Sequence, residues 1–139
     1  MSELVSDIME RDVITLDVSN PLLEVFNVFD QIKIRHIPIV TGETLVGMIS
    51  YSDVAVHRKG YDPDADEQDE EITSLLKNTV VKDYMNANPI SVRHNQTIIE
   101  VAEIFAKSAF HAMPVTDDHK LVGIISTTDL IRYFVEKFK

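Results

Sequence analysis

The chain has 139 residues, no cysteine and a formal net charge of −10, from 13 basic and 23 acidic side chains. The absence of cysteine excludes disulfide scaffolds, cysteine-ligated zinc, iron–sulfur clusters and thiol nucleophiles. The negative charge argues against nucleic-acid binding, and no apolar run reaches the roughly 18–20 residues of a membrane span. The acidic N-terminus does not resemble a signal peptide. We therefore expect a cytoplasmic protein of one compact domain or two small halves.

The first part of the chain predicts a short strand, a helix, two strands and a closing helix. Residues 13–16 form the extended opening piece. A helix is expected next, with Asn20 as its N-cap and Pro21 as its first residue, because apolar side chains then recur at helical spacing. Two runs rich in β-branched residues follow at 36–40 and 45–49, with a turn between them.

The middle of the chain differs in composition from both flanks. Residues 62–71 hold seven acidic side chains and no basic one, which is typical of a linker or surface loop. The spacing of their aspartates is that of a calcium loop, but Glu67 and Thr73 occupy the positions that require glycine and glutamate. We expect a solvated insert here, with weak divalent binding or a basic partner as the alternatives, and a short helix over residues 72–80. Outside this run the net charge is only −3, so a small anionic ligand is compatible with the rest of the chain.

The second part of the chain repeats the pattern of the first. Residues 89–92 are extended, and a capping box at 97–100 predicts the start of a helix. Two apolar runs at 113–116 and 121–125 flank a turn, and an amphipathic helix over 128–138 closes this part. Each part therefore reads β-α-β-β-α.

The two parts are copies of one unit. Residues 5–54 align with 81–130 without a gap and share 14 identical residues in 50 positions, where roughly 3 are expected from average composition. One such unit cannot cover both faces of its sheet. We therefore predict an α/β (α+β) fold of two β-α-β-β-α repeats packed about a pseudo-twofold axis. The expected boundaries are 1–60 for the first repeat, 61–78 for the acidic insert and linker, and 79–139 for the second repeat.

One motif occurs in both copies at the same offset. Residues 47–53 read GMISYSD and residues 123–129 read GIISTTD. Each is preceded by an apolar strand with a central proline, within residues 35–40 and 111–115. In these features the chain resembles a tandem pair of CBS domains, a Bateman module, over essentially its whole length apart from the acidic insert. The resemblance implies a regulatory module that binds an adenine nucleotide (AMP, ADP or ATP) as a ligand, and that forms a homodimer.

The residue types of this motif favour a nucleotide site on chemical grounds as well. Ser50 and Ser126, with the free N–H groups of the helix that follows, can meet phosphate or ribose oxygens, and the aspartate three residues later can accept both hydroxyls of a ribose. Gly47 and Gly123 allow a close backbone approach or an unusual dihedral angle. The alternative is structural: the serines cap their helices and the aspartates favour the helix dipole without any ligand.

The resemblance also assigns roles to individual residues. In the CBS family the aspartate typically holds the ribose, the opening extended piece and the apolar residue before the proline frame the adenine, and basic residues reach a phosphate across the cleft between copies. The candidate ligand-binding residues are Thr15, Arg35, His36, Ile37, Pro38, Ser50 and Asp53 in the first copy, and Ser91, His111, Met113, Pro114, Ser126, Thr128, Asp129 and Arg132 in the second. His111 aligns with Arg35 and Ala112 with His36, so the two sites are not expected to be equivalent.

Three functions stay open on the sequence. The first is a nucleotide sensor that transmits ligand occupancy to a separate partner protein. The second is a ligand-free dimerisation or scaffold module, or a module for another adenosyl ligand such as S-adenosylmethionine, NAD or cyclic di-AMP. The third is a hydrolase or transferase, which is disfavoured because no nucleophile stands with a histidine–acid pair and no Walker, Rossmann or zinc motif occurs. We expect a non-enzymatic regulatory module without a catalytic cofactor.

Overall fold

The computed structural model describes residues 3–55 and 70–139, which form two compact units. Of the described residues, 3–13, 43–45 and 89–139 belong to unit 1, and 14–42, 46–55 and 70–88 belong to unit 2. Each unit thus combines most of one sequence copy with the segment that opens the other copy. The acidic residues 62–69, with the calcium-like spacing, lie outside the described residues.

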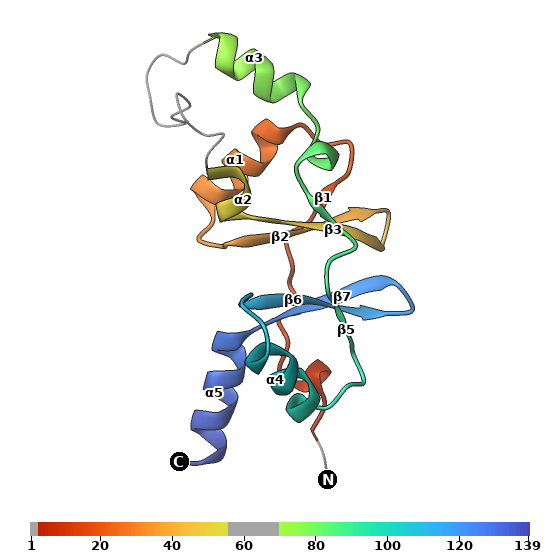
Figure 1. Ribbon diagram of the computed structural model, residues 1–139, viewed down its shortest axis with the longest axis vertical. Coiled ribbons are helices and arrows are strands. Elements are labelled where there is room, and N and C mark those ends of the chain that lie inside the picture. The colour runs from red at the N-terminus through yellow and green to blue at the C-terminus, as the bar shows by residue number, and fades with distance from the viewer. Residues whose placement is uncertain (1–2, 56–69) are drawn as a thin grey trace. The chain divides into compact units, whose positions relative to one another are not determined.

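Unit 2 is built on the first copy. Its elements are β1 (Leu16–Asp17), α1 (Leu22–Gln31), β2 (His36–Thr41), most of β3 (Thr44–Ser50), α2 (Tyr51–Ala55), α3 (Glu70–Asn78) and β4 (Asn86–Ala87). β1 pairs in parallel with β2, and β4 pairs antiparallel with β3. Helices α1 and α2 lie on one side of β2 and β3 (Figure 1). The apolar face of α1 packs there on Ile37, Ile39 and Ile49, which are fully buried.

Unit 1 has the same plan in the second copy. Its elements are a 3₁₀ turn (Val5–Asp7), β5 (Val92–Arg93), α4 (Ile98–Ala106), β6 (Ala112–Asp117), β7 (Lys120–Ser126) and α5 (Thr127–Lys137). β5 is parallel to β6, and β6 forms an antiparallel hairpin with β7. Asp118 and His119 have φ angles of 50° and 69°, as the two-residue turn of a tight hairpin requires. Helices α4 and α5 cover one side of this hairpin (Figure 1).

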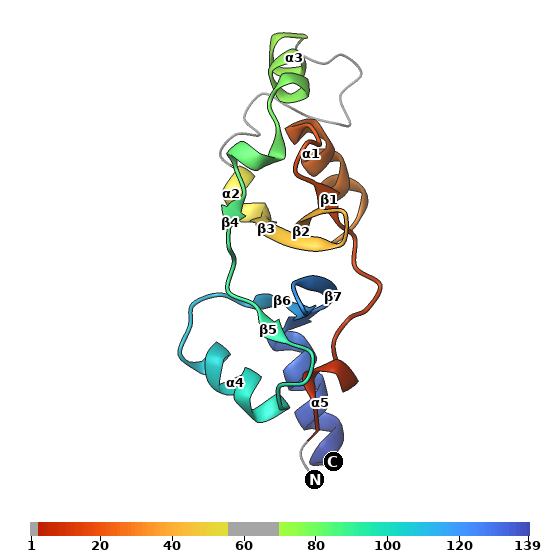
Figure 2. The same ribbon diagram turned by 90° about the vertical axis from the view of Figure 1, so that its right-hand side faces the viewer.

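The segment that opens each copy packs on the unit built from the other copy. In unit 1 the Val5 N–H donates to the Gln96 carbonyl at 2.9 Å, and in unit 2 the Val81 N–H donates to the Asn20 carbonyl at 2.9 Å. The two donors, Val5 and Val81, are equivalent positions of the repeat, and so are the two acceptors, Asn20 and Gln96. Each copy therefore contributes its opening segment to the unit built from the other copy. Figure 2 shows the N-terminal segment beside α5 and the segment before β5 running along β3. The repeat predicted from the sequence is confirmed, and its opening segments are exchanged.

The two motif glycines lie where these segments cross the strands. A Cβ at Gly123 would lie 2.5 Å from Met9 Sδ and 2.9 Å from the Glu10 carbonyl oxygen, and one at Gly47 would meet the Met85 side chain. Neither glycine has a positive φ angle. The predicted close approach is therefore confirmed, and the unusual dihedral angle, its alternative, is not found. The approaching atoms belong to the exchanged segments of the chain itself.

The start of α1 corrects one local prediction. The helix begins at Leu22, and its N-cap is Pro21, with φ −70° and ψ 150°, so the prediction of Asn20 as the N-cap is wrong. Asn20 Oδ1 instead accepts the Asp17 N–H at 2.7 Å and closes the turn before the helix. The opening strands also begin later than predicted, at Leu16 and Val92. The predicted capping box of α4 and the short helix α3 are confirmed.

Candidate functional site

The serine and aspartate of each motif bond to each other at the start of the closing helix. In unit 1 the Asp129 N–H donates to Ser126 Oγ at 3.1 Å, and the Ser126 N–H donates to Asp129 Oδ2 at 2.9 Å. In unit 2 the same two bonds join Ser50 and Asp53 at 3.2 and 2.9 Å. These are capping boxes, so the capping role is confirmed in both copies. The bond to Oδ2 also fixes the orientation of each carboxylate. The second oxygen, Oδ1, can still accept hydrogen bonds.

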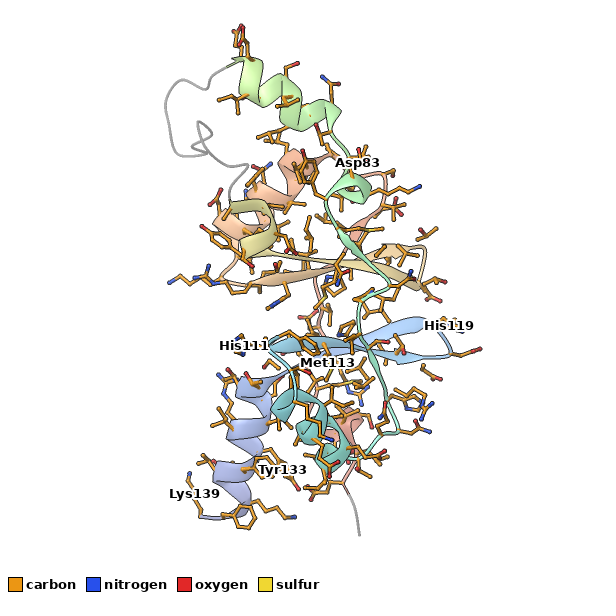
Figure 3. All side chains as sticks on the ribbon, in the orientation of Figure 1. Asp83, His111, Met113, His119, Tyr133 and Lys139 are labelled. Atoms are coloured by element: carbon orange, nitrogen blue, oxygen red, sulfur yellow. The ribbon has the colours of Figure 1, made fainter. Side chains whose placement is uncertain are left out.

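A basic residue lies beside each of these helix starts. The Arg35 carbonyl accepts the Tyr51 N–H at 2.8 Å, and the His111 carbonyl accepts the Thr127 N–H at 2.9 Å. Both basic side chains are exposed. Figure 3 shows His111, which directly precedes β6, where α5 begins, with His119 at the opposite end of the hairpin. In each unit, therefore, the main chain of a predicted basic residue bonds to the first residue of the helix whose first turn carries a predicted aspartate.

Tyr51 is a residue of this region that sequence reasoning missed. The centre of the Arg35 guanidinium lies 4.7 Å from the centroid of the Tyr51 ring. The ring of Phe29, from the core of unit 2, meets Tyr51 edge to face at 5.6 Å. The sequence does carry a sign of this difference. The motif serine is followed by the aromatic Tyr51 in the first copy and by Thr127 in the second.

The residues predicted to frame an adenine have unequal exposure. Ile37 and Met113 are fully buried in the cores of their units, and the prolines that follow them are buried too. Thr15 and Ser91 are exposed and directly precede β1 and β5. The strand side chains therefore build the cores, and their contact with a ligand stays a prediction. His36 is half-buried and Thr128 is exposed in the first turn of α5.

Asp129 and Arg132 line a groove of about 560 Å³ along α5. The N-terminal segment contributes Glu3 to its wall, and α5 contributes Tyr133 and Lys137. A hydrogen bond to the Glu3 carboxylate raises the pKa of the Tyr133 hydroxyl, and a hydrogen bond with Tyr133 raises the pKa of Lys137. Lys137 Nζ also lies 3.8 Å from a Glu3 carboxylate oxygen. These contacts join the N-terminal segment to the helix that carries Asp129.

Two further properties concern only the described part of the chain. No group of three or more histidine and acidic side chains in residues 3–55 and 70–139 could hold a metal ion. None of the helices described is both long enough and apolar enough to cross a membrane.

Comparison with known protein families identifies the repeat. The model of the CBS domain matches residues 5–60 and again residues 81–136. The chain belongs to the CBS domain family. The two matches cover the two sequence copies, so the predicted tandem CBS pair is confirmed.

Several relatives share this pair over nearly the whole chain. Protein MJ1426 of Methanocaldococcus jannaschii is 27% identical over 155 residues, which cover 95% of this chain and 91% of the relative. The CBS domain-containing protein YhcV of Bacillus subtilis is 24% identical, over 91% of this chain and 81% of its own. Protein MJ0188 of M. jannaschii is 28% identical over 99% of this chain, which spans only 46% of that relative.

Solved structures of CBS pairs have the same fold. CBSX2 in complex with AMP matches with a TM-score of 0.81 at 22% identity, over 99% of both chains. The CBS domain pair of protein MJ0100, in complex with 5′-methylthioadenosine and S-adenosyl-L-methionine, matches with a TM-score of 0.74 at 26% identity, again over 99% of both chains. The predicted mixed α/β fold is thereby confirmed.

Proposed function

We propose that this CBS pair is a regulatory module that binds an adenosine-containing ligand and transmits its occupancy to a separate protein. The observation that carries the proposal is found in both units: a capping bond fixes the aspartate in the first turn of the closing helix, and the main-chain carbonyl of a basic residue accepts the first N–H of the same helix. The 26% identical MJ0100 pair, whose solved complex holds two adenosyl compounds, supports the same ligand class.

The aspartates suit a ribose. Oδ2 of Asp53 and of Asp129 is engaged by a main-chain N–H, which fixes the plane of each carboxylate before a ligand arrives. Oδ1 can then accept a ribose hydroxyl. Because the carboxylate is already fixed, binding of the ligand costs less conformational entropy. The exposed Arg35 in unit 2 and the exposed Arg132 in unit 1 supply positive charge for the anionic group of a ligand bound to their own unit, and the exposed His111 can donate a hydrogen bond to such a group in unit 1.

An adenine nucleotide is the ligand that we propose within this class. In the part of the chain that the structure describes, neither Arg35 nor Arg132 has a carboxylate partner. Guanidinium groups bind phosphate oxygens in a bidentate manner, so these two side chains favour AMP, ADP or ATP over an uncharged nucleoside.

We also propose that the module acts as a homodimer. Helix α5 exposes Ile131, Val135 and Phe138, with 62%, 52% and 76% of their surfaces accessible. These residues form one stripe at helical spacing, and a second copy of the chain can cover it symmetrically. A ligand that binds one arrangement of such a dimer better than another would shift the equilibrium between them, as signalling requires.

Thermal unfolding with added ligand tests the site. AMP, ADP, ATP, S-adenosylmethionine, NAD and cyclic di-AMP are compared on the wild type, Asp53→Asn, Asp129→Asn and the double variant. Asparagine keeps one oxygen for the capping bond but replaces the second acceptor by a donor, so it should leave the helix start intact and weaken ribose binding. A ligand at 100 times its Kd should stabilise the wild type by about 2.7 kcal/mol. Asp12→Ala, at an exposed position, is the control.

Two results would contradict the proposal. If none of the compounds stabilises the wild type, the capping boxes serve the helices alone and the scaffold alternative holds. If the double asparagine variant keeps the full shift, the ligand binds elsewhere in the protein.

A further inference from the structure

The Arg35 side chain in unit 2 is held in place from two directions. Its main-chain carbonyl accepts the Tyr51 N–H at 2.8 Å, and the centre of its guanidinium lies over the Tyr51 ring, 4.7 Å from the ring centroid. The ring in turn meets Phe29 edge to face, and Phe29 is 8% exposed and belongs to the core. A chain of contacts therefore runs from the core of the unit to an exposed cation.

The contact with the ring leaves the guanidinium able to bind an anion. Arginine offers five N–H donors in a planar fork, and the cation–π contact itself uses none of them as a hydrogen bond to a protein acceptor. Arg35 has no hydrogen-bond or ion-pair partner among the described residues that would occupy these donors. An ordered arginine with free donors loses less conformational entropy on binding than a mobile one.

The second copy lacks this arrangement. His111 and Thr127 occupy the positions of Arg35 and Tyr51 and make the same main-chain bond, but threonine offers no ring. At this place in the repeat the two copies share the main-chain bond and differ in the two side chains.

We infer that Tyr51 is a positioning residue that holds the Arg35 guanidinium for the phosphate of a nucleotide, so that the first copy selects phosphorylated over uncharged adenosine. The inference rests on the proposed function and adds the residue that sets its selectivity. Tyr51 itself need not touch the ligand.

Isothermal titration with AMP and with adenosine tests this role. The measurements use the Asp129→Asn background, which weakens the second site, and compare Tyr51→Thr, Tyr51→Phe and Arg35→Ala. The quantity of interest is the ratio of the Kd for adenosine to the Kd for AMP. We expect Tyr51→Thr to reduce this ratio on the order of fivefold, as for loss of an exposed cation–π contact. The Kd for adenosine itself should stay unchanged.

The remaining variants separate positioning from a structural role. Tyr51→Phe keeps the ring and should keep the ratio, and Arg35→Ala should reduce it at least as much as Tyr51→Thr. The combination of Tyr51→Thr with Arg35→Ala should add nothing to Arg35→Ala alone, because both remove the same interaction. An unchanged ratio in Tyr51→Thr, or an equal loss for AMP and adenosine, would overturn the inference while the proposed function stands. If the wild type binds neither compound, the proposed function fails as well.

Discussion

Replacement of Gly123 by alanine should loosen the crossing between β7 and the N-terminal segment. The added Cβ would lie 2.9 Å from the Glu10 carbonyl oxygen and 2.5 Å from Met9 Sδ. Met9 can move its flexible side chain. The carbonyl cannot move freely, because it accepts the Ile124 N–H at 2.9 Å while the Glu10 N–H donates back to the Ile124 carbonyl at 2.9 Å.

The size of the effect follows from these contacts. Overpacking of this kind typically costs about 1–3 kcal/mol, and here the approach involves the main chain, so we expect a loss of about 2 kcal/mol in the free energy of unfolding. For a chain of this length that corresponds to a decrease of roughly 4–10 °C in Tm. Gly47→Ala should cost less, because the nearest main-chain oxygen, that of Asn86, would lie 3.2 Å away.

Urea denaturation and calorimetry of four variants measure this difference. Gly123→Ala and Gly47→Ala are compared with Met9→Ala and with the combination of Gly123→Ala and Met9→Ala. Met9 is 8% exposed, so its truncation alone should destabilise the protein. The combined loss should fall short of the sum of the two single losses only by the part that Met9 contributes, because the contact with the Glu10 carbonyl remains. A wild-type Tm for Gly123→Ala, or full relief of its loss by Met9→Ala, would refute the reasoning.

Three further predictions concern helix starts and the exposed face of α5. Ser126→Ala removes the acceptor of the Asp129 N–H and should lower stability in urea by about 1 kcal/mol, whereas Ser126→Thr should not. Hydrogen bonds from the Thr97 main chain and hydroxyl lower the pKa of Glu100, so their stabilisation is present above the ordinary carboxyl pKa and is lost as the pH falls through the lowered folded-state pKa. Thr97→Ala removes the hydroxyl bond to the Glu100 carboxylate and the bond from the Glu100 N–H to that hydroxyl, and it keeps the main-chain bond. It should therefore have a lower Tm than the wild type at neutral pH, and the difference should narrow in acid without vanishing; a constant difference would contradict this. Val135→Lys should convert the proposed homodimer to a monomer in light scattering without loss of helicity, and a retained dimer would exclude this face.

The order of elements could be predicted because each copy carries its own pattern. Apolar spacing indicates which side chains of α1 and α4 are buried, and the constant offset between the copies identifies the repeat. The exchange of the opening segments could not be predicted in this way. Val5 and Val81, like Met9 and Met85, are identical residues at equivalent positions, so hydrophobicity does not distinguish the two copies as packing partners.

The candidate site was predictable in part for a similar reason. The serine and aspartate of each motif were identified because their spacing is that of a helix start, which the bonds at Ser50 and Ser126 confirm. Tyr51 was missed because it occupies a position at which the two copies differ. Ile37 and Met113 show the limit of the resemblance, since a residue assigned to a ligand can equally be a core residue.

The reciprocal exchange has a consequence for any shortened form of the chain. A piece that contains only residues 79–139 would lack the N-terminal segment that completes unit 1. It would keep residues 79–88, the equivalent segment of the second copy, whose packing partner in unit 2 is missing. We expect two such pieces to complete each other, each donating residues 79–88 to its twin, because equivalent residues can make equivalent bonds. The boundary at which the sequence repeats is therefore not a boundary at which the folded protein can be divided.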